Sequence, residues 1–246
     1  MKPLAGKVAV VAGATRGAGR AIAIALGEAG ATVYATGRSV RGAPSDLARP
    51  ETIEETAELI TARGGQGIPV RVDHTEPEQV KALFERIGDE QGGRLDIIVN
   101  DVWGGEKLTE WGTPYWEGSL DKALLMQRRA VHSHMITSYY GAPLLVQRGE
   151  GLIVEVTDGY DYRYRGNLPY SLAKVSVIHL AEAQAAEWRP LPSRRDFCDP
   201  RKCWIISASP RRIGATERRR SRISSSRRRR SSLREDWPRS PPSRIC

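Results

Sequence analysis

The chain is poor in cysteine and has no long apolar run. Its three cysteines all lie after residue 188, so residues 1–188 offer no disulfide framework and no thiolate metal site. No apolar stretch approaches the roughly 20 residues of a membrane-spanning helix. Nothing near Met1 has the pattern of a secretory signal. These absences predict a cytoplasmic protein with no membrane partner and no bound metal.

Acidic residues are scarce at one end of the chain. Residues 189–246, called the tail below, hold 18 of the 38 lysines and arginines but only 5 of the 29 acidic residues, a net charge of +13. Residues 1–188, called the body, have a net charge of −4. The sequence isoelectric point near 9.7 therefore describes neither part. We expect a mildly acidic folded domain in 1–188, followed by a separate basic segment.

Along the body, short apolar runs alternate with helical patterns, which is the order of βαβ units. Strands are predicted at 8–11, 32–36, 68–73, 95–99 and 152–156. Helices are predicted at 20–27, 53–63, 77–90, within 120–147, and at 169–188. The pattern predicts an α/β fold of the Rossmann type, a doubly wound parallel sheet with helices on both faces.

A glycine-rich turn joins the first predicted strand to the first predicted helix. Gly13, Gly17 and Gly19 follow the spacing G-x-x-x-G-x-G, which departs from the commoner G-x-G-x-x-G. Gly13 permits a tight turn, and the other two let a pyrophosphate approach the backbone at the helix N-terminus. The turn predicts a dinucleotide site, although small residues that only allow close helix–sheet packing would give the same pattern.

Tyr170 and Lys174 are four residues apart near the start of the last predicted helix, so they lie on one helix face. An ammonium so placed can lower the pKa of a phenol that otherwise stays protonated near neutral pH. The spacing is common by chance, and the glycine-rich turn gives it weight. Together the two motifs predict hydride transfer.

With these motifs in this order, the body resembles the short-chain dehydrogenase/reductase family. Its fingerprint combines this glycine spacing, an Asn after the fourth strand, and Tyr-x-x-x-Lys. The resemblance implies that Tyr170 is the catalytic acid/base, while Lys174 lowers the phenol pKa and holds the nicotinamide ribose.

The family also places a Ser about a dozen residues before the Tyr. The resemblance implies that this Ser hydroxyl orients the substrate carbonyl, and Thr157, 13 residues before Tyr170, is the candidate catalytic residue for that role. It keeps a hydroxyl but has an added methyl group and a stiffer χ1. The adjacent Asp158 would repel a developing oxyanion. The further Asn that the family has in its central helix is not evident in 128–134.

The resemblance also implies a cofactor site. Asn100 closes the fourth strand, and Asp73 stands where the family contacts adenine, although a turn former at a strand end fits Asp73 nearly as well. Residues 35–39 contain no carboxylate for a ribose 2′-hydroxyl, whereas Arg38 and Arg16 suit a 2′-phosphate, so NADP is favoured over NAD. Either arginine alone could also be an ordinary surface charge. The predicted cofactor-binding residues are Gly13, Thr15, Arg16, Gly17, Gly19, Arg38, Asp73, Asn100, Tyr170 and Lys174.

Aromatic residues follow two predicted strands, at the sheet edge where ligands bind in this fold. They are Trp103, Trp111, Tyr115 and Trp116 after 95–99, and Tyr160, Tyr162 and Tyr164 after 152–156. Either they line a pocket for a bulky or aromatic carbonyl substrate, or they pack in a lid or a subunit contact.

His132 and His134 fall on different helix faces, which argues against a metal pair. Whether the chain forms a homo-oligomer is left open by the sequence.

The family pattern stops near Trp188, where a sixth strand and a Pro-Gly turn should follow. The tail is rich in Arg, Ser and Pro and cannot bury a core, so we expect it to be disordered and to replace the last strands. It is either an Arg-rich segment that binds nucleic acid or the product of an altered reading frame. Codons permitted for Cys203–Glu217 also encode, in another frame, a peptide of ordinary globular composition.

These observations predict an NADP(H)-dependent oxidoreductase that interconverts a carbonyl and an alcohol, with an activity that the altered tail would impair. The alternatives are nucleic-acid binding through the tail, and NADP(H) binding without turnover.

Overall fold

The computed structural model describes residues 2–43, 49–159, 162–188 and 203–207. Two units are distinguished in the chain, Met1–Pro210 and Arg211–Cys246, and every described residue belongs to the first. Most of the tail, and with it the Arg-rich nucleic-acid segment, lies outside the described residues.

A parallel sheet with the strand order β3-β2-β1-β4-β5-β6 forms the centre of the fold. The strands are β1 Val8–Ala12, β2 Thr32–Gly37, β3 Gln66–Arg71, β4 Ile97–Asn100, β5 Leu152–Thr157 and β6 Cys203–Ser207. The chain runs outward from β1 to β3 and then returns to place β4 on the other side of β1. In a sheet of this kind, the gap beyond the carboxyl ends of β1 and β4 is where ligands bind.

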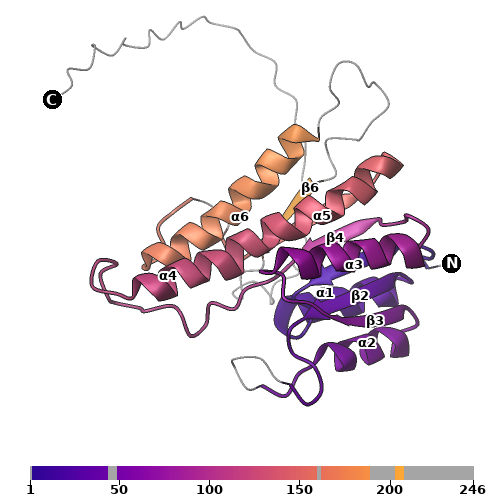
Figure 1. Cartoon of the computed structure of the whole chain (residues 1–246), viewed down its shortest axis with the longest axis horizontal. Coiled ribbons are helices and arrows are strands. Elements are labelled where there is room, and N and C mark those ends of the chain that lie inside the picture. The colour runs from indigo at the N-terminus through magenta and orange to yellow at the C-terminus, as the bar shows by residue number, and fades with distance from the viewer. Residues whose placement is uncertain (1, 44–48, 160–161, 189–202, 208–246) are drawn as a thin grey trace, which may run out of the picture. The chain divides into compact units, whose positions relative to one another are not determined.

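Helices cover both faces of the sheet (Figure 1). They are α1 Gly17–Glu28, α2 Ile53–Ala62, α3 Pro77–Glu90, α4 Leu120–Gln127, α5 Ser133–Arg148 and α6 Leu168–Glu187. Alternation along β1 assigns the faces: Val8 and Val10 pack with α3 and α5, and Ala9 and Val11 pack with α1 and α2. The doubly wound fold is confirmed, since β1 is buried on both faces. Among the described helices, none has both the length and the apolar character of a membrane span.

The helix predicted within 120–147 is not uniform. Between α4 and α5 the five residues Arg128–His132 form a π-helical turn, η1. Ser133 Oγ donates to the Arg129 carbonyl at 2.6 Å, and Arg129 Nη1 donates to the Gly104 carbonyl at 3.2 Å. The π turn therefore directs Arg129 toward the loop that follows β4, an irregularity of the kind often found at functional sites.

The expectation that the tail is disordered and replaces the last strands is wrong at one point. Cys203–Ser207 forms β6, which pairs in parallel with β5 from Ile153 to Thr157. The five residues Cys-Trp-Ile-Ile-Ser are mostly apolar and β-branched or aromatic, a composition that suits a strand beside β5. Because the tail as a whole is highly charged, its composition does not reveal this short apolar run.

Candidate active site

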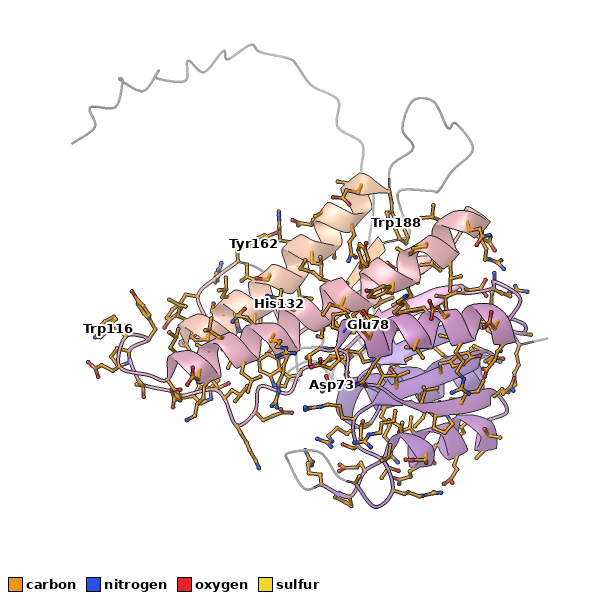
Figure 2. All side chains as sticks on the ribbon, viewed as in Figure 1. Asp73, Glu78, Trp116, His132, Tyr162 and Trp188 are labelled. Carbon is orange, nitrogen blue, oxygen red and sulfur yellow. The ribbon has the colours of Figure 1, made fainter. Side chains whose placement is uncertain are left out.

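A cleft of about 340 Å³ lies at the carboxyl ends of the central strands. The glycine-rich turn, the ends of β2 and β3, and the loop after β4 form its walls, through residues that include Gly13, Thr15, Arg16, Gly37, Arg38, Asp73, Asp101, Val102, Trp103 and Gly104. Figure 2 shows Asp73 at this edge of the sheet, close to the ends of the strands. The cleft therefore gathers five of the ten residues that the sequence predicts for a cofactor: Gly13, Thr15, Arg16, Arg38 and Asp73.

Each glycine of the turn is required either by close backbone packing or by its backbone conformation. A Cβ on Gly13, which has a φ of +89°, would stand 2.6 Å from the Asp101 carbonyl oxygen. A Cβ on Gly19 would stand 2.4 Å from the Gly13 carbonyl oxygen. Gly17 has a φ of +59° with open space around it, so there the requirement comes from the backbone conformation. The turn thus keeps bare backbone facing the cleft.

Asp101 satisfies one amide at the start of α1. Its carboxylate accepts a hydrogen bond from the Gly19 amide. Burial raises the pKa of Asp101 to about 6, although this bond and the nearby His134 and Lys174 act in the opposite direction. The amides of the first two residues of the helix, Gly17 and Ala18, precede this contact, and a helix N-terminus of this kind suits a phosphate.

Two arginines border the cleft. Arg16 Nη2 donates to Ser39 Oγ at 3.2 Å, and Arg38 Nη1 lies 3.8 Å from Asp73 Oδ2. Asp73 Oδ1 also accepts hydrogen bonds from the amide and the hydroxyl of Thr75, at 2.9 and 2.7 Å. Asp73 is therefore both a turn former and a cleft residue. Both guanidinium groups therefore border the same cleft.

Asn100 serves the core rather than the cleft wall. It is fully buried, and its amide nitrogen donates to Glu155 Oε1 at 2.8 Å and to Ser138 Oγ at 3.0 Å. Through these bonds it joins the end of β4 to β5 and α5. A cofactor contact through its side chain stays a prediction.

Glu155 is also paired with His134, and both side chains are buried. His134 Nδ1 lies 2.7 Å from Glu155 Oε2, and Nε2 lies 2.9 Å from the Val102 carbonyl oxygen. Burial alone would lower the pKa of His134, but Glu155 and the Val102 carbonyl raise it above its ordinary value. Since both partners accept hydrogen bonds, both ring nitrogens donate. His132 is exposed, so the two histidines lie on different faces as predicted.

The start of α6 fixes Tyr170. Asn167 is the N-cap, and its Oδ1 accepts from the Tyr170 amide at 3.0 Å. Asn167 Nδ2 donates to the Glu110 carbonyl at 2.9 Å, which ties the loop after β4 to this helix. Lys174 follows one turn later on the same face.

The Tyr170 phenol donates a short hydrogen bond to Asp158 Oδ2. Lys174 Nζ lies 3.5 Å from Asp158 Oδ1, and Arg165 Nη2 lies 3.2 Å from Asp158 Oδ2. Burial and then Asp158 raise the pKa of Tyr170 to about 12, while Arg165 opposes them. The prediction that Lys174 lowers the pKa of Tyr170 is wrong for this structure, because the Lys174 ammonium forms an ion pair with the Asp158 carboxylate. Burial also lowers the pKa of Lys174.

Thr157 binds backbone groups instead of the phenol. Its hydroxyl donates to the Lys174 carbonyl at 3.1 Å and accepts from the Gly159 amide at 3.2 Å. The side chain that reaches Tyr170 belongs to Asp158, 12 residues before it, and sequence reasoning missed this contact. The family's Ser stands about a dozen residues before its Tyr, a spacing that fits Thr157 and Asp158 equally, so the sequence does not show which of them reaches the phenol.

Two of the aromatic side chains pack on Tyr170. The ring centroids of Trp103 and Trp111 lie 5.4 and 5.1 Å from that of Tyr170, and Lys174 Nζ lies 3.6 Å from the Trp103 ring. Trp103 also lines the cleft, whereas Tyr170 and Lys174 are absent from its described lining. Trp103 therefore joins the cleft to the Tyr–Lys pair.

The other aromatics lie away from Tyr170. Tyr115 and Trp116 pack on each other and are exposed, and Figure 2 shows Trp116 at the outer end of the loop between β4 and α4. Tyr162 donates to Glu182 at 2.6 Å, and Tyr164 is exposed. Tyr160 lies outside the described residues.

Residues 7–191 match the family model described as short chain dehydrogenase. The chain belongs to this family. It is 36% identical over 189 residues to human dehydrogenase/reductase SDR family member 1, which covers 76% of this chain and 57% of that protein. The chain thus spans a little over half the length of this curated relative.

Solved structures agree with the fold. A short-chain type dehydrogenase/reductase from Mycobacterium marinum superimposes with a TM-score of 0.61 at 28% identity, covering 75% of this chain and 70% of the other. A candidate NAD(P)-dependent gluconate 5-dehydrogenase from Beutenbergia cavernae, with NADP bound at low occupancy, also gives 0.61 at 28% identity, covering 75% and 68%.

Proposed function

We propose that this protein is an NADP(H)-dependent oxidoreductase that interconverts a carbonyl and an alcohol. The observation that carries the proposal is the Tyr170–Lys174 pair, fixed at the start of α6 and joined through Trp103 to a cleft with bare backbone and two arginines. Family membership supports the reaction class, and the NADP in the Beutenbergia cavernae structure supports the cofactor.

A nicotinamide cofactor, when bound, supplies or accepts the hydride. Tyr170 holds the proton: with a pKa of about 12 its phenol is protonated at neutral pH and can donate to a carbonyl oxygen. The Trp103 and Trp111 rings pack against the Tyr170 ring. Gly13, Gly17 and Gly19 would receive the pyrophosphate, while Thr15, Arg16, Arg38 and Asp73 would line the adenosine end.

The test is NADPH oxidation by the full chain with a panel of aliphatic and aromatic aldehydes and ketones. Turnover that depends on a carbonyl supports the proposal. No turnover, in this chain and in a second chain with the alternative reading frame restored after residue 202, would reject it. Tight NADPH binding without turnover in either chain would instead favour a cofactor-binding protein.

Replacing Arg38 with Ser should raise the dissociation constant for NADPH about 10- to 100-fold and leave that for NADH nearly unchanged. A charge-assisted hydrogen bond to a phosphate contributes about 1.5–3 kcal/mol, and only NADPH has the 2′-phosphate. Calorimetric titration of both cofactors measures the difference. Arg41→Ser is the matched control, since Arg41 pairs with the exposed Glu58. Equal weakening of both cofactors would contradict the assignment of Arg38.

Self-association is also part of the proposal. Large apolar side chains are exposed on α4, α5 and α6, among them Leu120, Leu124, Met135, Tyr139, Leu168 and Leu172. Exposed apolar residues at i, i+4 spacing on helices often mark an interface.

The double variant Leu124→Lys, Leu172→Lys should therefore sediment as a smaller species than the unaltered chain, because buried charge opposes an apolar contact. Leu59→Lys on α2 should not change the sedimentation coefficient. A monomeric unaltered chain would contradict the proposal.

For the substrate, the contacts of Trp103 and Trp111 with Tyr170 support an apolar or aromatic carbonyl compound. A cytoplasmic location stays a proposal, supported by a body that contains no cysteine.

A further inference from the structure

Asp158 occupies a central place among the side chains around Tyr170. It directly follows β5 and is about one quarter exposed. Its carboxylate accepts a hydrogen bond from the Tyr170 phenol and forms ion pairs with Lys174 and Arg165. Arg165 Nη1 also donates to the Asp158 main-chain carbonyl at 2.6 Å, which fixes the residue at two points.

An ionised carboxylate can only accept hydrogen bonds. Where the family has a Ser hydroxyl, which donates as well as accepts, this chain therefore has an acceptor beside the phenol. Thr157 does not replace the donor in this structure, because its hydroxyl proton is committed to the Lys174 carbonyl. A phenolate at Tyr170 would face the like charge of Asp158.

We propose that Asp158 is a further catalytic residue, whose carboxylate holds the Tyr170 phenol in its protonated form and so favours carbonyl reduction over alcohol oxidation at neutral pH. This inference rests on the proposed function. In reduction, the carbonyl carbon gains a hydride from the cofactor, the phenol O–H bond breaks, and the carbonyl oxygen gains that proton. The phenolate then regains a proton from water. In oxidation, the alcohol proton moves to the Tyr170 oxygen, so the phenol must first have lost its own.

Other charged groups also act on the Tyr170 phenol and the Asp158 carboxylate. Arg165, from the loop before α6, acts against Asp158 and lowers the pKa of Tyr170. Lys174 of α6 lies beyond Asp158, and Asp101, from the loop after β4, acts on Lys174 in turn. The net effect of burial and these charges is a pKa for Tyr170 of about 12. Asp158 is the largest contributor among the side chains.

The experiment uses the full chain with Asp158→Asn, which keeps the shape of the side chain and removes its charge. Tyrosine labelled with ¹³C at Cζ reports the titration of Tyr170, assigned by its loss in Tyr170→Phe. The pKa of Tyr170 should fall by about one unit or more, and alcohol oxidation with NADP⁺ at pH 8 should rise about tenfold, because one pKa unit is a tenfold change in phenolate. Reduction should not accelerate.

Asp89→Asn, which alters an exposed carboxylate of α3, should change neither readout. If Asp158→Asn does not fold, Asp158→Ser serves instead and should shift the oxidation profile in the same direction. An unchanged Tyr170 titration overturns the proposal, and so does an equal loss of both directions with no change in their pH profiles. No NADPH oxidation by either the unaltered chain or the chain with the restored reading frame is a separate result, which rejects the proposed function and with it a catalytic Asp158.

Discussion

Tyr170→Phe should lower kcat for carbonyl reduction by about 10²- to 10⁴-fold, the range that a positioned proton donor contributes. The substitution removes one oxygen and with it the proton that the substrate oxygen receives. The ring should keep its contacts with Trp103 and Trp111, because these involve the aromatic carbons. Stopped-flow measurement of NADPH consumption under single-turnover conditions separates the chemical step from product release.

Affinity for NADPH should change little, since the described lining of the cleft does not include Tyr170. Tyr164→Phe is the matched control: it removes the same oxygen from an exposed side chain of the preceding loop and should leave kcat unchanged. A Tyr170→Phe enzyme with full kcat would show that another group donates the proton.

Glu155→Ala should lower the free energy of unfolding by about 3–5 kcal/mol, the cost of removing one partner of a buried ion pair. Glu155 Oε1 accepts from Asn100 and Oε2 from His134, so its loss leaves two buried donors without an acceptor. Urea denaturation followed by far-ultraviolet circular dichroism measures the change. Glu85→Ala breaks the exposed pair with Lys81 and should leave the urea midpoint unchanged.

The loss of unfolding free energy caused by Glu155→Ala should depend on pH. Folding raises the pKa of His134. The stabilisation that protonated His134 contributes is therefore fully present below the unfolded-state pKa of about 6.5, and it is lost as pH rises through the folded-state pKa. The gap between the two chains should therefore be wider at pH 6 than at pH 9. A gap of constant size would show that His134 is neutral when folded.

The sequence predicted most of the fold because local pattern and tertiary structure agree. Val8 and Val10 on one face and Ala9 and Val11 on the other form a continuous apolar run, which is what a strand buried on both faces requires. Gly13 and Gly19 likewise follow from one turn whose geometry excludes a side chain.

Other features depend on contacts between distant segments. Asp158 meets Lys174 and Arg165 only because β5 and α6 pack together, and an adjacent Asp and Thr give no sign in the sequence of which one faces the phenol. In the π turn at Arg128–His132 the Arg129 carbonyl accepts from the Ser133 hydroxyl, and the Arg129 side chain binds the distant Gly104 carbonyl, a contact that helical periodicity does not reveal. β6 was missed because five apolar-rich residues stand in a strongly charged segment.

The indole of Trp103 has a consequence for how the two ligands change each other's affinity. The same ring borders the cleft on one side and carries the Lys174 ammonium on the other. A dinucleotide that shifts this ring would also change the surroundings of the ammonium and the phenol, and so the affinity for a carbonyl compound. By thermodynamic reciprocity, that compound would alter the affinity for the dinucleotide by the same factor. Trp103 would thus couple the binding of the dinucleotide to the binding of the carbonyl compound.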